Sequence, residues 1–167
     1  MPNTFRTAVI GLGSMGYGVA QSCLRGGHVT YGFDVVPSQI ERLQSEGGAK
    51  GDLADIAGTL DAAVMVVLNA AQTEDVLFGK RGLVPMMRKG AVVLACATVP
   101  PNFARTMEAR CSALGVRYLD APISGGSAKA ASGQLSIMAS GTPDAFAAAA
   151  PVLDATAETV FELGDAA

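Results

Sequence analysis

The sequence predicts an α/β fold, a doubly wound and mostly parallel sheet with helices on both faces. Strand-like and helix-like segments alternate along the whole chain, which is the order that repeated βα units produce. Half of the 167 residues are hydrophobic but only 5% are aromatic, a composition typical of strands buried on both faces. A glycine-rich segment at residues 11–16 follows the first apolar run, where such folds turn from strand to helix.

Each element is predicted from a local pattern. Runs of β-prone apolar residues predict buried strands, and apolar residues at helical spacing predict the helices that cover them. Strands are expected at residues 7–10, 29–33, 62–68, 91–97, 116–119, 133–140 and 159–163. Helices are expected after residue 16, at 38–46, 53–58 and 72–78, after the proline pair at 100–101, just before Gly133 and at 143–153. The 133–140 strand and the final strand are expected to run antiparallel at one edge.

The most regular helical stripe follows Pro101. Proline suits a helix start because its φ is already helical, and apolar side chains follow at i, i+4, i+8 and i+11. They are expected to form one continuous inward stripe: Phe103, Met107, Cys111 and Leu114. His28, by contrast, follows two glycines and is expected at the surface or in a turn.

Composition and charge limit the classes of partner. The net charge is −3 at pH 7 with no basic cluster, which argues against nucleic acid and anionic membrane surfaces. The runs at 62–68 and 91–97 are too short to span a bilayer, and the N-terminus lacks the pattern of a signal peptide. Three cysteines without C-x-x-C spacing predict free thiols in a reducing cytoplasm. One histidine without a ligand cluster argues against a metal site.

The glycine segment reads G-x-G-x-x-G and predicts a Rossmann-type dinucleotide site. Gly11 permits the tight turn, Gly13 leaves room for a pyrophosphate, and Gly16 lets the next helix lie close to the sheet. Free N–H groups at the start of that helix are expected to face the phosphates. Asp34 ends the second predicted strand; it is expected to accept the ribose hydroxyls and to repel a 2′-phosphate. The expected cofactor is therefore NAD in preference to NADP. The residues expected to contact it here are Gly11, Leu12, Gly13, Ser14, Met15, Gly16 and Asp34.

A second motif carries a family resemblance. Residues 120–126 read Asp-Ala-Pro-Ile-Ser-Gly-Gly, and residues 130–141 fit the pattern A-x-x-G-x-L-x-x-M-x-x-G. Together they resemble the β-hydroxyacid dehydrogenase family, which includes the 3-hydroxyisobutyrate, tartronate-semialdehyde and threonate dehydrogenases and reads D-A-P-V-S-G-G in the first motif. The glycine segment also matches the family's usual G-L-G-x-M-G. The stretches 67–72, 129–133 and 138–141 are most similar to the L-threonate dehydrogenase branch.

The resemblance implies that Ser124, Gly125 and Gly126 bind the carboxylate of a small hydroxyacid or its neighbouring hydroxyl. A helix N-terminus can supply the backbone N–H donors that this requires. Lys129 has two interpretations, a contact to the charge of the substrate or an ordinary solvated helix lysine. Asp120 is expected to brace the loop through Asx-type hydrogen bonds.

Three further cofactor contacts are expected where buried strands end: Leu68, Asn69 and Thr98. The carboxyl ends of these strands border the cofactor crevice of a doubly wound sheet, and by resemblance Thr98 lies near the nicotinamide. The family usually has Leu-Pro where this chain has Leu68-Asn69, and serine where this chain has Ala97. Cys96 either lines the same pocket or is a small core hydrophobe.

The resemblance also implies a second, all-α domain. The family's catalytic residue is a lysine in a G-x-G-x-x-x-K-x-x-N motif after the last strand, and this chain ends at Ala167, before that motif. Residues 1–167 are therefore expected to be the NAD-binding domain of a two-domain, homo-oligomeric dehydrogenase, with little turnover alone. A mean hydropathy of +0.35 predicts an exposed apolar patch that favours self-association.

Other interpretations stay open at this stage. A non-catalytic NAD-binding module would carry the same glycine motif. So would the cofactor domain of a tartronate-semialdehyde or 3-hydroxyisobutyrate dehydrogenase. The cofactor domain of an imine reductase is similar, although the intact 120–126 motif argues against it.

Overall fold

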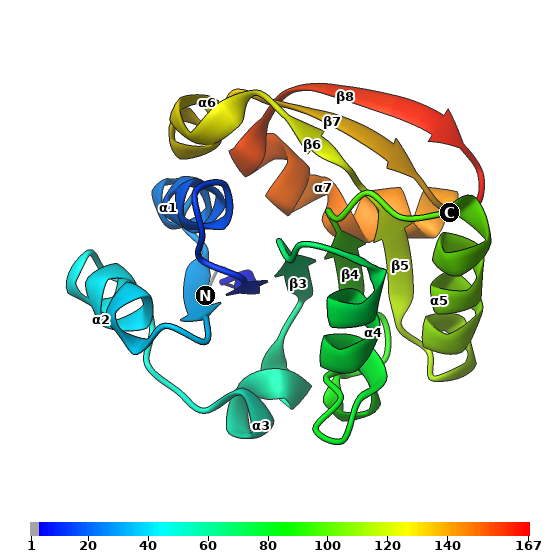
Figure 1. Cartoon of the computed structure of the whole chain (residues 1–167), viewed down its shortest axis with the longest axis horizontal. Helices are drawn as coiled ribbons and strands as arrows, with labels where there is room; N and C mark the ends of the chain where they lie inside the picture. The colour runs from blue at the N-terminus through cyan, green and yellow to red at the C-terminus, as the bar shows by residue number, and fades with distance from the viewer. Residues whose placement is uncertain (1–3) are drawn as a thin grey trace.

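The computed structural model describes residues 4–167, and Figure 1 shows their arrangement. In the first half the elements are β1 (Arg6–Ile10), α1 (Gly16–Arg25), β2 (Val29–Phe33), α2 (Pro37–Ser45), α3 (Leu53–Ile56), η1 (Ala57–Thr59), β3 (Ala62–Met65) and α4 (Ala70–Phe78). In the second half they are η2 (Val84–Met86), β4 (Val92–Ala95), α5 (Pro101–Ala113), β5 (Arg117–Asp120), β6 (Ile123–Ser124), α6 (Gly126–Ser132), β7 (Leu135–Ser140), α7 (Pro143–Thr156) and β8 (Ala157–Gly164). Here η marks a single turn of 3-10 helix.

The strands form one sheet in the order β2-β1-β3-β4-β5-β7-β6, with β8 paired to β7. The five strands from β2 to β5 are parallel. β7 runs antiparallel to both β5 and β6, and β8 runs parallel to β7. The predicted α/β class and the antiparallel edge are therefore confirmed. The chain order reverses at β1, between β2 and β3, which makes this point the topological switch of the sheet.

Two hydrophobic layers enclose the sheet, as alternation along each strand requires. Val9, Val64 and Leu94 face the layer formed with α1, α2, α6 and α7. Their neighbours Ala8 and Ala63 face the layer formed with α4, α5 and the 3-10 turns. Figure 1 shows α1 and α7 on one side of the central strands and α3 and α4 on the other. Because small and branched apolar residues fill both layers, helices pack closely on each face of the sheet.

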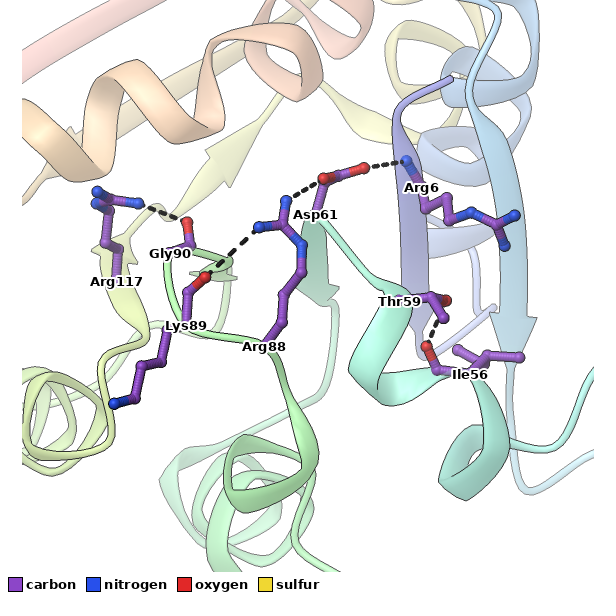
Figure 2. A network of polar contacts seen from close by, with 8 residues as sticks. All are labelled: Arg6, Ile56, Thr59, Asp61, Arg88, Lys89, Gly90 and Arg117. Carbon is purple, nitrogen blue, oxygen red and sulfur yellow. Dashed lines mark hydrogen bonds and ion pairs between the residues drawn. The ribbon is translucent and has the colours of Figure 1, made fainter. Parts of the chain in front are cut away.

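Polar contacts fasten the amino ends of the strands (Figure 2). Asp61 precedes β3, and its Oδ2 accepts the backbone N–H of Arg6 at 2.7 Å. Its Oδ1 pairs with the guanidinium of Arg88. Nearby, Arg117 Nη1 donates to the carbonyl of Gly90 at 2.5 Å. These contacts hold the loops at the end of the sheet that is opposite to the carboxyl ends of the parallel strands.

Two predicted strands are shorter than expected. β3 ends at Met65 and β4 at Ala95, although strands were expected to continue to residues 68 and 97. β1 turns away at Gly11, so the chain after Val66 has no neighbouring strand with which to pair. Residues 66–69 and 96–98, beyond the ends of these strands, instead line the carboxyl edge of the sheet.

One predicted side-chain position is wrong, and a second is wrong in part. Leu114 is 44% exposed, because α5 ends at Ala113 and Gly115, at φ +76°, reverses the chain. His28 is buried rather than at the surface. Its Nδ1 lies 2.9 Å from Oγ1 of Thr7, so the turn before β2 carries a histidine that packs on β1.

Two other kinds of feature are missing from the described part of the chain. Between residues 4 and 167 there is no helix that is both long enough and apolar enough to cross a membrane. Nor do any three His, Cys, Asp or Glu side chains of that segment form a group that could hold a metal ion.

Candidate functional site

The glycine turn between β1 and α1 has one open side. Gly11 has φ +95°, and a Cβ there would lie 2.1 Å from the carbonyl oxygen of Val66. A Cβ on Gly16 would lie 1.8 Å from the carbonyl oxygen of Gly11. Packing therefore requires both of these glycines. A Cβ on Gly13 would meet nothing within 4 Å, so the fold itself does not demand glycine there, and the space beside it is free for a ligand.

The N-terminus of α1 is prepared for an anion. Its N-cap residue Met15 makes no side-chain capping bond, and its first turn carries no acidic residue. Within residues 4–167, the N–H groups of Gly13, Ser14 and Met15 donate no hydrogen bond. Free amides at the positive end of a helix bind phosphate groups well. Ser14 is exposed and Met15 half-buried, so the turn is accessible.

Asp34 is held rigidly at the end of β2. Its Oδ2 accepts the N–H of Leu12 at 2.7 Å, and its Oδ1 accepts the N–H of Val36 at 2.8 Å. Each carboxylate oxygen has a further lone pair, so both can still accept a ligand hydroxyl. The side chain of Leu12 is fully buried, and its N–H is engaged by Asp34, so Leu12 acts on the site through Asp34.

A groove of about 760 Å³ runs along the carboxyl edge from Asp34 to Leu68. Gly11 and Gly13 lie on its wall with both of these residues. The motifs had not indicated the rest of the lining: Val35, Leu53, Val66, Val67, Gln72, Asp75, Val76, Lys80 and Arg81. Of these, Val35 could have been suspected from the sequence, because an apolar residue directly follows Asp34. In the structure its side chain is 98% exposed and lines the groove. The others depend on how α4 packs beside β1.

The residues after β3 and β4 lie at the same edge but differ in role. Leu68 is 85% exposed and lines the groove. Asn69 caps α4, because its Oδ1 accepts the N–H of Gln72 at 2.9 Å. Oε1 of Gln72 in turn accepts the N–H of Leu68 at 2.9 Å. Thr98 is exposed after β4. The groove thus includes Leu68, while Asn69 and Thr98 lie outside its lining.

The loop with Ser124, Gly125 and Gly126 lies beside the glycine turn because α6 packs on α1. A Cβ on Gly18 of α1 would lie 2.5 Å from the backbone nitrogen of Ala131, so the two helices approach closely. Gly125 and Gly126 have φ +138° and +78°, conformations that glycine adopts without strain. All three loop residues are exposed.

Lys129 lies over this loop, and no ion pair within residues 4–167 includes it. Its side chain is exposed, and its Cβ and Cδ would lie 3.0 Å from a Cβ on Gly125. The alkyl part of Lys129 therefore packs beside Gly125, whereas a Cβ on Gly126 would meet nothing within 4 Å.

Asp120 does not brace the loop as expected. Its Oδ1 is buried without a hydrogen-bond partner among the described residues, and burial raises the pKa of the carboxyl to about 6. It lies near the thiol of Cys96, whose pKa is raised to about 12 first by burial and then by the charge of Asp120. The loop is held instead by its backbone, with Met138 N–H donating to the carbonyl of Pro122 at 2.9 Å.

The glycine turn, the free amides of α1 and the anchored acid define a dinucleotide-binding α/β domain. Comparison with known proteins agrees with this class. Residues 6–164 match the family described as the NAD binding domain of 6-phosphogluconate dehydrogenase, and the chain belongs to that family.

Relatives of this chain are hydroxyacid dehydrogenases. The L-threonate dehydrogenase of Haemophilus influenzae is 44% identical over 164 residues, 96% of this chain and 54% of that protein. The NAD-dependent L-serine dehydrogenase of Pseudomonas aeruginosa is 33% identical over 94% of this chain and 53% of its own length. The crystal structure of a 3-hydroxyisobutyrate dehydrogenase from Salmonella typhimurium has a TM-score of 0.92 and 43% identity, covering 97% of this chain and 57% of that one. The resemblance to β-hydroxyacid dehydrogenases is thus confirmed, and the chain spans about half the length of the curated relatives it matches.

Proposed function

We propose that residues 1–167 form the NAD-binding domain of a dehydrogenase that oxidises a small β-hydroxyacid of the threonate kind. Such an enzyme transfers a hydride from the hydroxyl-bearing carbon to NAD. The names of the relatives support the substrate class, and their greater length supports a further domain that supplies the proton acceptor and the oligomer contacts. The observation that carries the proposal is the open Gly13 beside three free amides at the start of α1.

In this proposal the nucleotide is held from two neighbouring strand ends. The N–H groups of Gly13, Ser14 and Met15 bind the pyrophosphate, and Asp34 accepts the hydroxyls of the adenosine ribose. Val35 packs against the adenine.

NAD is proposed in preference to NADP because of Asp34. Its two backbone contacts keep it from turning away from the 2′ position, so it opposes a 2′-phosphate at close range. Lys80 and Arg81 also line the groove, but both are exposed and have no such anchor within the described residues.

The substrate end of the proposal lies further along the carboxyl edge. Leu68, Asn69 and Thr98 border the nicotinamide, with Asn69 mainly shaping the start of α4. In the loop before α6, Ser124, Gly125 and Gly126 bind the carboxylate of the hydroxyacid or its neighbouring hydroxyl. Lys129 is proposed to attract the substrate's charge from the rim of this loop, since its ammonium group is free to move toward it.

Titration calorimetry with NADH and NADPH tests the proposal on the 167-residue chain. Gly13→Ala should fold normally and weaken NADH binding by about tenfold, because a methyl group separates the backbone from the pyrophosphate. Gly58→Ala is the matched control, since a Cβ there makes only an ordinary contact of 3.6 Å, and Gly58 does not line the groove. Failure of the wild-type chain to bind either nucleotide would overturn the proposal. Tighter binding of NADPH than of NADH would overturn the cofactor preference.

A further inference from the structure

The direction of the bound dinucleotide follows from the sheet order, and this step rests on the proposed function. Asp34 lies at the end of β2 and the amides of α1 lie at the end of β1. The sheet continues from β1 to β3, β4 and β5. With the adenosine over β2, the other half of the molecule extends across the ends of these three strands. At a strand spacing of about 4.8 Å, β5 lies roughly 14 Å from β1, within reach of an extended dinucleotide.

Charge is scarce along this part of the edge. The residues that follow β3, at 66–69, and those that follow β4, at 96–99, carry no charged side chain at neutral pH. The thiol of Cys96 stays protonated, since its pKa is raised to about 12. Asp120, the last residue of β5, is therefore the one acidic side chain at the ends of β3, β4 and β5 in the described structure.

The carboxylate of Asp120 has no compensating partner. Its backbone is fixed by pairing with Ala95 of β4 and Ser140 of β7, and its Oδ1 is buried without a hydrogen bond within residues 4–167. None of the ion pairs of that segment includes it. The titratable groups near it, Cys96 and Tyr118, both have a pKa raised by burial and remain neutral.

We infer that Asp120 makes this domain bind the oxidised dinucleotide more tightly than the reduced one. The nicotinamide ring of NAD⁺ is positively charged and that of NADH is neutral, while the rest of the two molecules is identical. A carboxylate at the strand ends whose Oδ1 is buried without a partner would attract the charged ring and not the neutral one. Asp120 thus acts as a selectivity residue for the redox state of the cofactor, and the low local polarity makes the attraction effective.

The attraction is linked to protonation of Asp120. The free carboxyl ionises as the pH rises through about 6, so the preference for NAD⁺ is complete above that pH and is lost gradually as the pH falls below it. By reciprocity, bound NAD⁺ lowers the pKa of Asp120 and bound NADH does not. His28 also has a pKa lowered mainly by burial, but it packs on Thr7 in β1 and affects the two nucleotides equally.

Calorimetric titrations of NAD⁺ and NADH between about pH 5.5 and pH 8 test the inference on the whole 167-residue chain. If NAD⁺ lowers the pKa of Asp120 by about one unit, the full preference is about tenfold, and the wild-type ratio of affinities should shift toward NAD⁺ by about threefold across this range. In Asp120→Asn the ratio should not change with pH. Asp154→Asn, which removes an exposed carboxylate of α7, is the matched control and should behave like wild type.

Each outcome has a defined meaning. A wild-type ratio that is independent of pH, or one that Asp120→Asn leaves unchanged, overturns the inference while NADH binding still supports the proposed function. Loss of binding of both nucleotides by the wild-type chain overturns the proposed function itself. If Asp120→Asn does not fold by circular dichroism, the carboxyl carbon of Asp120 is titrated by nuclear magnetic resonance in the wild-type chain. A pKa that NAD⁺ lowers more than NADH supports the inference, and equal values refute it.

Discussion

The carboxylate of Asp34 accepts the backbone N–H of Leu12 at 2.7 Å, so the acid at the end of β2 is fastened to the glycine turn at the end of β1. Its second oxygen accepts the N–H of Val36 at 2.8 Å. The two halves of the nucleotide site, the phosphate amides and the ribose acceptor, are therefore fixed relative to one another without any ligand. Preorganisation of this kind reduces the ordering cost of binding.

Asp34→Ala should weaken NADH binding by about 10–100-fold, since hydrogen bonds to a charged group contribute about 1.5–3 kcal/mol. The same change should narrow the gap between NADH and NADPH, because the charge that opposes the 2′-phosphate is removed. Calorimetry with both nucleotides measures this, with Asp154→Asn as a control for net charge. Unchanged NADH affinity in Asp34→Ala would contradict the assigned role.

Gly11→Ala should lower the free energy of unfolding by about 2–4 kcal/mol. The added methyl group sits at a positive φ, which is unfavourable for alanine, and it also clashes severely with the backbone. The clash is the 2.1 Å approach of a Cβ to the carbonyl oxygen of Val66. Gly13→Ala, two residues further on, should change stability by less than about 0.5 kcal/mol. Urea unfolding of both variants separates the fold requirement from the ligand requirement. Equal destabilisation by the two substitutions would refute the distinction.

Asn69→Ala should lower the free energy of unfolding by about 1 kcal/mol, the usual loss when a helix N-cap is removed. Thr142→Ala should have a similar effect, since Oγ1 of Thr142 caps α7 by accepting the N–H of Ala145 at 3.2 Å. Thr98→Ala, at an exposed position outside the helices, should be nearly neutral. Thermal unfolding of the three variants compares them, and a neutral Asn69→Ala would show that the cap is dispensable.

Much of the fold was predictable because strand burial and helix periodicity are local properties. β2 occupies the expected residues 29–33, and β7 alternates buried and half-buried side chains along its length. The end of β3 was not predictable from its apolar run, since pairing stops where β1 turns away. The prediction that Leu114 is buried was wrong for a similar reason, because the periodic stripe in the sequence continues past the point where Gly115 reverses the chain.

The site was predictable only where a motif requires particular residues. The glycine turn and Asp34 follow from the needs of a strand–turn–helix unit. The wall formed with Gln72, Lys80 and Arg81 depends on the packing of α4, which no short pattern encodes. Asp120 was visible as part of a motif, but its missing hydrogen-bond partner is a property of the folded structure.

β8 should cause the 167-residue chain to self-associate. It pairs with β7 along one side, and it exposes Phe161 by 50% and Leu163 by 67%. Exposed edge strands with apolar side chains favour contacts between copies. Sedimentation velocity over a concentration series should show a dimer or larger species. The double change Phe161→Ser and Leu163→Ser should reduce it, and Leu114→Ser, at the end of α5, should not. A wild-type chain that stays monomeric at high concentration would contradict this prediction.

Asp120→Asn should increase the free energy of unfolding above about pH 7. Burial raises the pKa of Asp120 from 3.8 to about 6, so the folded state holds this proton more tightly than the unfolded state. The stability that the proton provides is complete below about pH 4 and is lost as the pH rises through about 6. Asparagine does not ionise, so the variant should exceed wild type by about 1 kcal/mol near pH 8, a value reduced for partial exposure. Near pH 4 that advantage should vanish.

Chemical unfolding of wild type, Asp120→Asn and Asp154→Asn across this pH range measures the difference. The histidine His28, whose pKa is lowered mainly by burial, adds stability with rising pH in all three proteins and cancels in the comparison. If Asp120→Asn is less stable than wild type at every pH, Asp120 has a favourable partner in the folded state. If it is more stable only at high pH, the domain retains a destabilising charge at the strand ends, which is the condition that lets a positively charged ring bind there preferentially.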